Sequence, residues 1–197
     1  MTTLSIAKSE FILGGQRSGK SRRAEMLARA WLDQSETYSA VLIATAQPWD
    51  DEMRERIIRH QADRALRVPG MVTVEEPLAL AEAIALHSQP NTLVVVDCLT
   101  LWLTNLLMPA EAEMLKQNGP LALAEYARTA SFLIAIEDSP GPVVLVGNEI
   151  GLGVIPMGRE VRAFVDALGR LNQDVASVCQ RVTLMAAGLP LHLKGAP

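Results

Sequence analysis

The sequence is poor in the residue types that identify several common protein classes. Only 4% of its 197 residues are aromatic, and only two are cysteines. So few aromatic side chains argue against a surface that binds nucleic acids by base stacking. Cys98 and Cys179 are too few and too far apart for a disulfide framework or a zinc cluster. Since both lie in apolar stretches, we expect two free, buried thiols.

Positive charge and long apolar runs are also scarce. Eighteen Lys and Arg residues against 22 Asp and Glu residues give a net charge of −4, without the basic excess of a dedicated nucleic-acid-binding protein. The most apolar run, residues 93–107, is interrupted by Asp97 and Asn105 and is too short to span a membrane. The first ten residues lack the apolar core of a signal peptide. We therefore expect a cytoplasmic protein with no membrane insertion and no nucleic-acid partner.

The remaining pattern alternates short apolar runs with longer amphipathic segments. Buried strands are predicted at residues 11–13, 40–44, 93–96, 143–146 and 182–185. Helices are predicted at residues 21–33, 51–64, 78–87, 121–137 and 159–181. Residues 72–74 and 191–193 are candidate edge strands, the second one antiparallel, and residues 108–120 are predicted to end a helix and form a loop.

This alternation predicts an α/β fold with a mostly parallel central sheet and helices on both faces. The length favours a single domain over residues 1–197, with residues 1–9 as an N-terminal extension.

A phosphate-binding motif follows the first predicted strand directly. It has the form G-x-x-x-x-G-K-S and consists of Gly14, Gly15, Gln16, Arg17, Ser18, Gly19, Lys20 and Ser21. The glycines let backbone N–H groups surround a phosphate, and the N-terminus of the next helix adds positive partial charge. Lys20 is expected to reach the β- and γ-phosphates, and the Ser21 hydroxyl to ligate Mg²⁺. The motif predicts a P-loop NTPase-like fold that binds a nucleotide.

Two further features limit the kind of nucleotide enzyme. Asp97 closes the apolar run 93–96 and belongs either to the Mg²⁺ shell, directly or through water, or to the cap of the next helix. The place at which signalling GTPases carry Asn-Lys-x-Asp holds Gly147-Asn148-Glu149-Ile150 instead. This difference favours a small-molecule enzyme over a switch GTPase.

The predicted helix at residues 51–64 carries a histidine between arginines. Asp50 is placed to cap its N-terminus, and Arg56, His60 and Arg64 fall on one face at four-residue spacing. A histidine there could act as a nucleophile, with the arginines pairing with phosphate oxygens. A solvated basic stripe explains the same spacing.

Together these motifs resemble the bifunctional adenosylcobinamide kinase/adenosylcobinamide-phosphate guanylyltransferase family of cobalamin biosynthesis, over residues 11–194. The segments that carry the resemblance are the phosphate loop, Ile43-Ala44-Thr45-Ala46, Asp50-Asp51-Glu52-Met53 with Arg56-Ile57 and His60, Val74-Glu75-Glu76-Pro77-Leu78, Val96-Asp97-Cys98-Leu99-Thr100, Thr104-Asn105-Leu106-Leu107, and Val146-Gly147-Asn148-Glu149-Ile150-Gly151-x-Gly153. The phosphate loop alone would be generic, but this combination in this order is specific.

The resemblance implies two reactions at one nucleotide site. ATP or GTP first phosphorylates adenosylcobinamide; His60 then takes GMP from GTP and passes it to adenosylcobinamide phosphate, giving adenosylcobinamide-GDP. Besides the phosphate loop, with Lys20 as a catalytic residue, the implied nucleotide contacts are Ala44, Thr45, Ala46, Gln61, Ala62, Asp63, Arg64, Glu75 and Asp97. A one-residue slip would exchange Glu75 for Glu76. The resemblance also implies Mg²⁺ without a prosthetic group, and a homotrimer.

Corrinoid contacts cannot be derived from spacing, and two other functions stay open from the residues alone. Positions beyond predicted strand ends offer Trp102, Asn105, Asn148, Glu149, Arg159 and Arg162 as candidates for the corrinoid. One alternative function is a P-loop kinase of another small hydroxylated metabolite, with His60 on a helix surface. The other is an assembly factor that uses nucleotide hydrolysis as a switch.

Overall fold

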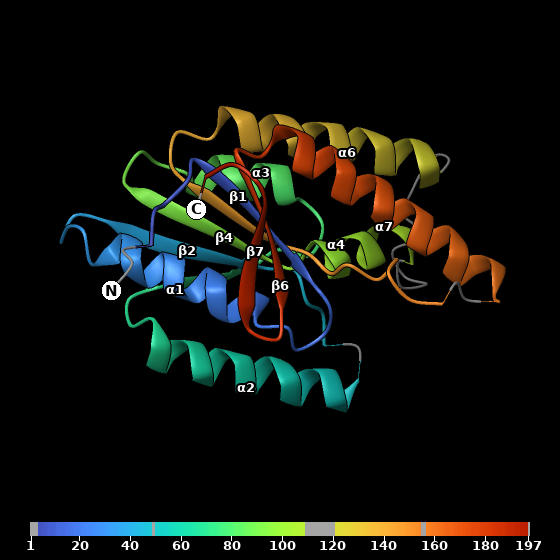
Figure 1. The fold of residues 1–197 in the computed structure, drawn as a ribbon, viewed down its shortest axis with the longest axis horizontal. Coiled ribbons are helices and arrows are strands. Elements are labelled where there is room, and N and C mark those ends of the chain that lie inside the picture. The colour runs from blue at the N-terminus through green and yellow to red at the C-terminus, as the bar shows by residue number, and fades with distance from the viewer. Residues whose placement is uncertain (1–3, 49, 109–120, 155–156, 197) are drawn as a thin grey trace.

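The computed structural model describes residues 4–48, 50–108, 121–154 and 157–196, without the side chains of residues 56 and 121–125. Its centre is a seven-stranded sheet with the order β3-β2-β4-β5-β1-β6-β7 (Figure 1). The strands are β1 (Ser9–Gly14), β2 (Ser39–Ala44), β3 (Val72–Glu75), β4 (Thr92–Asp97), β5 (Val143–Val146), β6 (Arg181–Ala186) and β7 (Leu189–Lys194). The helices are α1 (Lys20–Leu32), α2 (Asp51–Arg67), α3 (Leu80–His87), α4 (Leu99–Leu107), α6 (Leu121–Asp138) and α7 (Arg159–Val178).

The sheet is parallel except for its last strand pair, as the apolar runs predict. Successive residues of a strand point to opposite faces, and both faces are covered. In β1, Phe11 and Leu13 pack among residues of α3, α4, α6 and α7, whereas Ile12 packs against α1. This double burial explains why the strands are continuous apolar runs rather than alternating ones.

The helices divide between the two faces of the sheet. Figure 1 shows α1 against one face with α2 beyond it, and α3, α6 and α7 on the other side. The helices on both faces confirm the predicted α/β architecture. Helix α2 is peripheral, because α1 lies between it and the sheet.

Strand β1 occupies a central position in the sheet. It pairs in parallel with β5 and β6, so that Ile12 is in register with both Val146 and Thr183. The carboxyl ends of these parallel strands therefore meet at one edge, which is where open α/β sheets bind their ligands. The loop after β1 lies in the middle of that edge.

The two ends of the sheet are the predicted edge strands. β3 lies at one end and β7 at the other. β7 pairs antiparallel with β6, which confirms the expected orientation. Ala187 and Gly188 join the two strands with φ angles of 52° and 80°, the positive values that a type I′ hairpin turn requires.

Some predicted boundaries differ from the structure. The helix predicted at 159–181 ends at Val178, and β6 begins at Arg181; buried Val175, Cys179 and Val182 continue the apolar spacing through the turn and hide it. For α4, the sequence predicted only that a helix ends near residue 108. It is buried around much of its circumference, so it lacks a clear polar face. The loop predicted at 108–120 lies, from residue 109 onward, outside the described residues.

In the part of the chain that the structure describes, no helix combines the length and the apolar character needed to cross a bilayer.

Candidate active site

The phosphate loop lies between the end of β1 and the start of α1, as the motif predicts. A Cβ atom on Gly14 would lie 2.5 Å from the carbonyl oxygen of Met185 and 2.6 Å from Oγ of Ser18. Gly19, with a φ of 100°, and Arg17, with a φ of 56°, have left-handed backbone conformations. Close approach thus requires glycine at position 14, and conformation favours it at position 19.

Lys20 begins α1 and is only 8% exposed. Its Nζ donates a hydrogen bond to the carbonyl oxygen of Gly15 at 2.7 Å, so the ammonium group lies over the loop. The side chains of Gln16 and Arg17 are exposed, whereas Ser18 is buried. The loop therefore presents backbone groups and one fixed cation, the combination that binds phosphate.

Two segments distant in the sequence hold the phosphate loop. The backbone N–H of Gly188, in the β6–β7 turn, donates to the carbonyl oxygen of Ser18 at 3.0 Å, and the N–H of Glu149, after β5, donates to that of Gly14 at 3.2 Å. Sequence reasoning did not find Gly188. The Ala187-Gly188 pair between two apolar runs is the hairpin signal that would have indicated a turn there.

A buried charge network connects β1, α1 and β6. Glu10, on β1, is 1% exposed; it pairs with Nε of Arg23, on α1, at 3.0 Å and with Nη1 of Arg181, on β6, at 3.1 Å. The Thr183 hydroxyl donates to the same carboxylate at 2.9 Å. Since Glu10 and Arg23 lie on the two elements that flank the phosphate loop, their ion pair joins the strand before the loop to the helix after it.

Asp97 ends β4 at the same edge of the sheet and is half-buried. Burial, and then the charge of Asp97, raise the pKa of the Cys98 thiol to about 11, while the charge of Lys20 lowers it; both charges are therefore near this thiol. The N-cap of α4 is Cys98, without a side-chain cap hydrogen bond, so the structure does not show Asp97 capping that helix.

The donor set at this edge fits Mg²⁺. Ser21, in the first turn of α1, and Asp97 offer a hydroxyl and a carboxylate, both half-buried. Proteins usually hold this ion with one or two such ligands and complete its shell with phosphate oxygens and water. Among the described residues, no group of three or more His, Cys, Asp or Glu side chains could hold a metal by itself. The arrangement suits a metal that binds together with a nucleotide.

The last residue of β2 and the two residues after it are Ala44, Thr45 and Ala46. Thr45 is completely buried, and its hydroxyl donates to the carbonyl oxygen of Cys98 at 2.7 Å and accepts from the N–H of Cys98 at 2.9 Å. Its side chain is therefore occupied within the protein. Ala44 and Ala46 are half-buried, so they are the members of this segment with surface to offer a nucleotide.

The structure distinguishes Glu75 from Glu76. Oε1 of Glu76 accepts the N–H groups of Leu78 and Ala79 at 2.9 and 2.8 Å, just before α3 begins. Glu75, at the end of β3, is exposed, and Nε2 of Gln61 lies 3.5 Å from its Oε1. Glu76 thus stabilises a helix start, and Glu75 is the acid that faces α2.

Helix α2 carries the remaining predicted site residues. Oδ1 of Asp50 accepts the N–H of Met53 at 2.7 Å, which confirms the predicted N-cap. His60 is exposed, whereas Arg64, on the same predicted face, is 7% exposed and donates to Oγ1 of Thr73 at 3.2 Å. The side chain of Arg56 lies outside the described residues.

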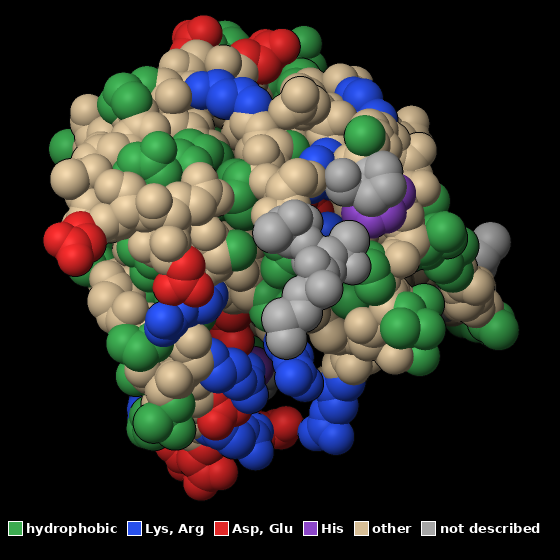
Figure 2. Space-filling model, turned by 60° about the vertical axis from the view of Figure 1, so that its left-hand side comes forward, with side chains coloured by type: hydrophobic (Ala, Val, Ile, Leu, Met, Phe, Trp, Pro, Cys, Tyr) green, Lys and Arg blue, Asp and Glu red, His purple; other side chains and the backbone are tan. Residues whose placement is uncertain are grey.

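The other residues predicted on α2 lie close to His60 in the sequence. Gln61 and Ala62 are exposed, and Asp63 pairs with Arg67 at 3.2 Å. Arg67 also pairs with Glu25 of α1 at 3.0 Å, and this hydrogen bond and charge raise the pKa of Arg67. Figure 2 shows basic and acidic side chains interleaved at the lower end of the molecule, the end at which α2 lies in Figure 1.

The corrinoid candidates fall into two groups. Trp102 is 1% exposed and donates from Nε1 to the carbonyl oxygen of Leu78 at 3.0 Å, and Asn105 is 3% exposed. Both are interior residues, so burial removes them as surface contacts. The other candidates keep accessible surface; they are Asn148, Glu149, Arg159 and Arg162.

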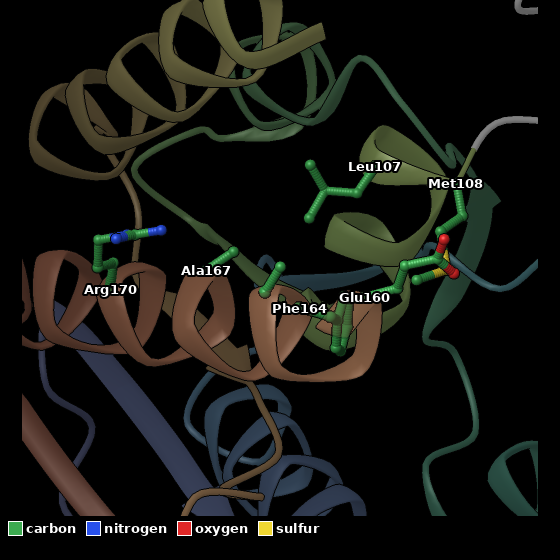
Figure 3. A pocket seen from close by; sticks show the side chains of 7 residues that line it. Leu107, Met108, Glu160, Phe164, Ala167 and Arg170 are labelled. Carbon is green, nitrogen blue, oxygen red and sulfur yellow. The ribbon is translucent and has the colours of Figure 1, made fainter. Parts of the chain in front are cut away.

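A cavity of about 480 Å³ lies between α4 and α7 (Figure 3). Leu107, Met108 and Phe164 supply apolar walls, and Glu160 and Arg170 lie at opposite ends of the lining. None of the phosphate-loop residues lines it. We therefore do not assign the triphosphate to this cavity.

Both cysteines are buried and free, as expected. Burial raises the pKa of Cys179 to about 12. With both thiols protonated at neutral pH, neither is suited to nucleophilic catalysis.

Comparison with known proteins identifies the same family that the sequence motifs resemble. A family model described as cobinamide kinase / cobinamide phosphate guanyltransferase matches residues 10–193. The chain is 44% identical over 189 residues to the bifunctional adenosylcobalamin biosynthesis protein CobP of Pseudomonas aeruginosa, covering 95% of this chain and 98% of that one. It is 36% identical over 186 residues to the bifunctional adenosylcobalamin biosynthesis protein CobU of Escherichia coli K12, covering 93% and 98%.

A similar fold is found at much lower sequence identity. The flagellar accessory protein FlaH of Methanocaldococcus jannaschii superposes with a TM-score of 0.50 at 11% identity, over 96% of this chain and 80% of that one. This likeness concerns the fold alone.

Proposed function

The chain belongs to the cobinamide kinase / cobinamide phosphate guanyltransferase family, and from that premise we propose that both reactions use the one phosphate loop and that His60 carries the transferred GMP. The enzyme phosphorylates adenosylcobinamide and then guanylylates the product in cobalamin biosynthesis. The single observation that carries the proposal is the meeting of the phosphate loop, Asp97 and the β3 end beside α2 at one edge of the sheet. The residues predicted to contact the nucleotide lie in the phosphate loop, at or just after the ends of β2, β3 and β4, and on α2.

In the kinase reaction, the terminal hydroxyl oxygen of the aminopropanol arm attacks the γ-phosphorus of ATP or GTP. The new O–P bond forms as the bond between the γ-phosphorus and the bridging β-phosphate oxygen breaks. The nucleoside diphosphate leaves, and the hydroxyl proton is released to water. Catalysis of this transfer depends mainly on position and on neutralising charge. The N–H groups of the loop and the Lys20 ammonium group supply the positive charge that neutralises the phosphates. Bound Mg²⁺, held by Ser21 and Asp97, would neutralise phosphate oxygens further.

In the guanylyltransferase reaction, a ring nitrogen of His60 attacks the α-phosphorus of GTP. An N–P bond forms and pyrophosphate leaves. A phosphate oxygen of adenosylcobinamide phosphate then attacks the same phosphorus, and the N–P bond breaks, which frees His60 and gives adenosylcobinamide-GDP. A phosphoramidate keeps the guanylyl group activated, so the covalent route divides one transfer into two easier ones.

The surroundings of His60 support its choice. It is exposed on α2, and the next residue, Gln61, contacts Glu75 at the end of β3. His192, in contrast, lies in the edge strand β7 with Nδ1 3.4 Å from the Thr183 hydroxyl. His87 is in the last turn of α3. Only His60 adjoins residues proposed to contact the nucleotide.

The remaining assignments follow from the same proposal. We assign nucleotide contacts to the phosphate loop, Ala44 to Ala46, Gln61 to Arg64, Glu75 and Asp97. For Thr45 the contact would be through its backbone, because its side chain is occupied. We further propose that the enzyme works in the cytoplasm as a homotrimer on small-molecule substrates.

A labelling experiment tests the covalent mechanism. The protein is incubated with Mg²⁺ and GTP labelled at the α-phosphate, then denatured and separated from free nucleotide. We expect retained label that is acid-labile and alkali-stable, lost in His60→Ala and kept in His87→Ala. Phosphorylation of adenosylcobinamide should stay within about twofold in His60→Ala. A wild-type protein that never retains label would contradict the histidine intermediate and leave the kinase site intact.

A further inference from the structure

Asn105, on α4, joins two loops of the active-site edge from beneath. It is 3% exposed. Its Nδ2 donates to the carbonyl oxygen of Thr45, after β2, at 2.8 Å and to that of Pro77, after β3, at 3.1 Å. Both amide hydrogens are therefore used on backbone acceptors. Because Asn105 is buried, it acts on these loops and not on a ligand.

Thr45 continues this contact to the end of β4. Its backbone N–H donates to the carbonyl oxygen of Asp97 at 3.1 Å. Its hydroxyl both donates to and accepts from the backbone of Cys98, at 2.7 and 2.9 Å. Three hydrogen bonds thus fix the backbone on both sides of the Asp97–Cys98 junction. Asn105 holds the residue that makes all three.

We propose that Asn105, acting through Thr45, is a positioning residue that fixes the Asp97 carboxylate for the Mg²⁺-bound triphosphate. The inference rests on the role of Asp97 in the proposed function. Residues that orient a metal ligand without touching the metal commonly change metal affinity ten- to a hundredfold when they are removed. The effect on nucleotide binding should therefore be larger when Mg²⁺ is present than when it is absent.

The test compares nucleotide affinity with and without the metal. Dissociation constants of a fluorescent GTP analogue are measured in Mg²⁺ and in EDTA for the wild type and for Asn105→Ala. We expect Asn105→Ala to weaken binding about tenfold more in Mg²⁺ than in EDTA, since any loss in EDTA reports its direct hold on the Thr45 backbone. Thr45→Val, which removes the hydroxyl at constant volume, should show the same larger loss in Mg²⁺. Thr45→Ser, which keeps the hydroxyl, should keep the wild-type ratio of the two dissociation constants.

Trp102→Phe is the matched control. Trp102 lies on the same helix, and its side chain also donates one hydrogen bond to the segment after β3, to the carbonyl oxygen of Leu78. Its loss should lower the melting temperature and leave the Mg²⁺ dependence unchanged. A purely structural role for Asn105 would instead make the two variants behave alike.

The outcomes separate this inference from the proposed function. A folded Asn105→Ala protein whose loss of affinity is no larger in Mg²⁺ than in EDTA overturns the inference, as does a Trp102→Phe protein with the same larger loss in Mg²⁺. If Asn105→Ala does not fold, Thr45→Val decides in the same way. Asp97→Asn is measured alongside: if it also leaves Mg²⁺-dependent binding unchanged, the metal role of Asp97 fails as well. If it weakens that binding while the other two do not, only the positioning role fails.

Discussion

The phosphate loop is held by backbone hydrogen bonds from two remote segments and flanked by a buried ion pair, whereas α2 is attached to the molecule by side chains near its C-terminal end. Gly188 and Glu149 donate backbone hydrogen bonds to the loop, and the Glu10–Arg23 ion pair joins the strand before it to the helix after it. On α2, Arg64 reaches Thr73, and Arg67 reaches Glu25. Arg64 alone is buried among the described side chains of this helix.

This difference in attachment suits the two roles in the proposed mechanism, a phosphate site and a histidine nucleophile. A phosphate site works best when its dipoles and charges are fixed before the transition state forms, because no reorganisation is then needed. A nucleophile that is loaded by one substrate and discharged by another must meet both. Elements that move in such cycles belong to the less stable parts of a fold. Under the proposed mechanism, we infer that the phosphate loop, which serves both reactions, is preorganised and that α2, which carries His60, is adaptable.

The largest effect is expected from Lys20→Ala. Removal of one preorganised charge at a phosphoryl-transfer site costs on the order of 10³-fold in rate, and in the proposed mechanism both reactions share this loop. Phosphorylation of adenosylcobinamide and retention of α-phosphate label should therefore fall together. Lys194→Ala is the control, since its Nζ binds the carbonyl oxygens of Ala176 and Ser177 on the surface. Label retention that survives in Lys20→Ala would mean that the two regions use separate sites.

The rigidity of the loop region is tested by Glu10→Gln. This change leaves Arg23 and Arg181 buried without a countercharge, which costs about 3 kcal/mol of unfolding free energy. Urea denaturation measures the loss. Asp33→Asn breaks the exposed pair with Arg29 and should cost less than about 0.5 kcal/mol. Equal losses in the two variants would refute the idea of a specifically clamped loop.

A smaller effect is expected from the alkaline titration of Cys179. Its pKa of about 12 lies above the ordinary value of 9.0, so above pH 9 the unfolded chain releases a proton that the folded protein retains. The contribution of Cys179 to the unfolding free energy is complete below pH 9. It falls by about 1.4 kcal/mol per pH unit as the pH rises toward 12. Between pH 8 and 10.5, unfolding free energy should drop by about 2 kcal/mol more in the wild type than in Cys179→Ala. Identical pH profiles would contradict the burial argument.

The smallest effect concerns the attachment of α2. Arg67→Ala removes the ion pair with Glu25 and should loosen the helix by about 1 kcal/mol, since Arg67 itself is half exposed. Amide hydrogen exchange in α2 should become about fivefold faster, with no change in β1 or β4. Arg29→Ala, on the outer face of α1, serves as the control. Faster exchange throughout the sheet would show that α2 is part of the rigid unit.

The parts of the fold that sequence could predict are those with a local cause. The strand–loop–helix context of Gly14 to Ser21 follows from a short motif, and the cap by Asp50 follows from its position before the helix. Continuous apolar runs indicated a sheet covered on both faces. The candidate edge strand at residues 191–193 lies within β7.

The parts that could not be predicted depend on residues far apart in the sequence. Asn105 stands after a strand, which suggested a ligand contact, but α4 folds beneath the loops and turns its amide toward Thr45. The contact of Gly188 with Ser18 joins the hairpin near one end of the chain to the loop near the other. Residue spacing along the sequence cannot identify such long-range contacts.

The central place of β1 also has a consequence for synthesis on the ribosome. Ser9 pairs with Val143, and Glu10 with Arg181, so the first strand made must wait for two of the last. At roughly 5–20 residues per second, that delay is on the order of ten seconds. During it, Phe11, Ile12 and Leu13 lack the strands that will flank them. Nascent chains should therefore be most prone to aggregate, and most in need of chaperones, before β6 emerges.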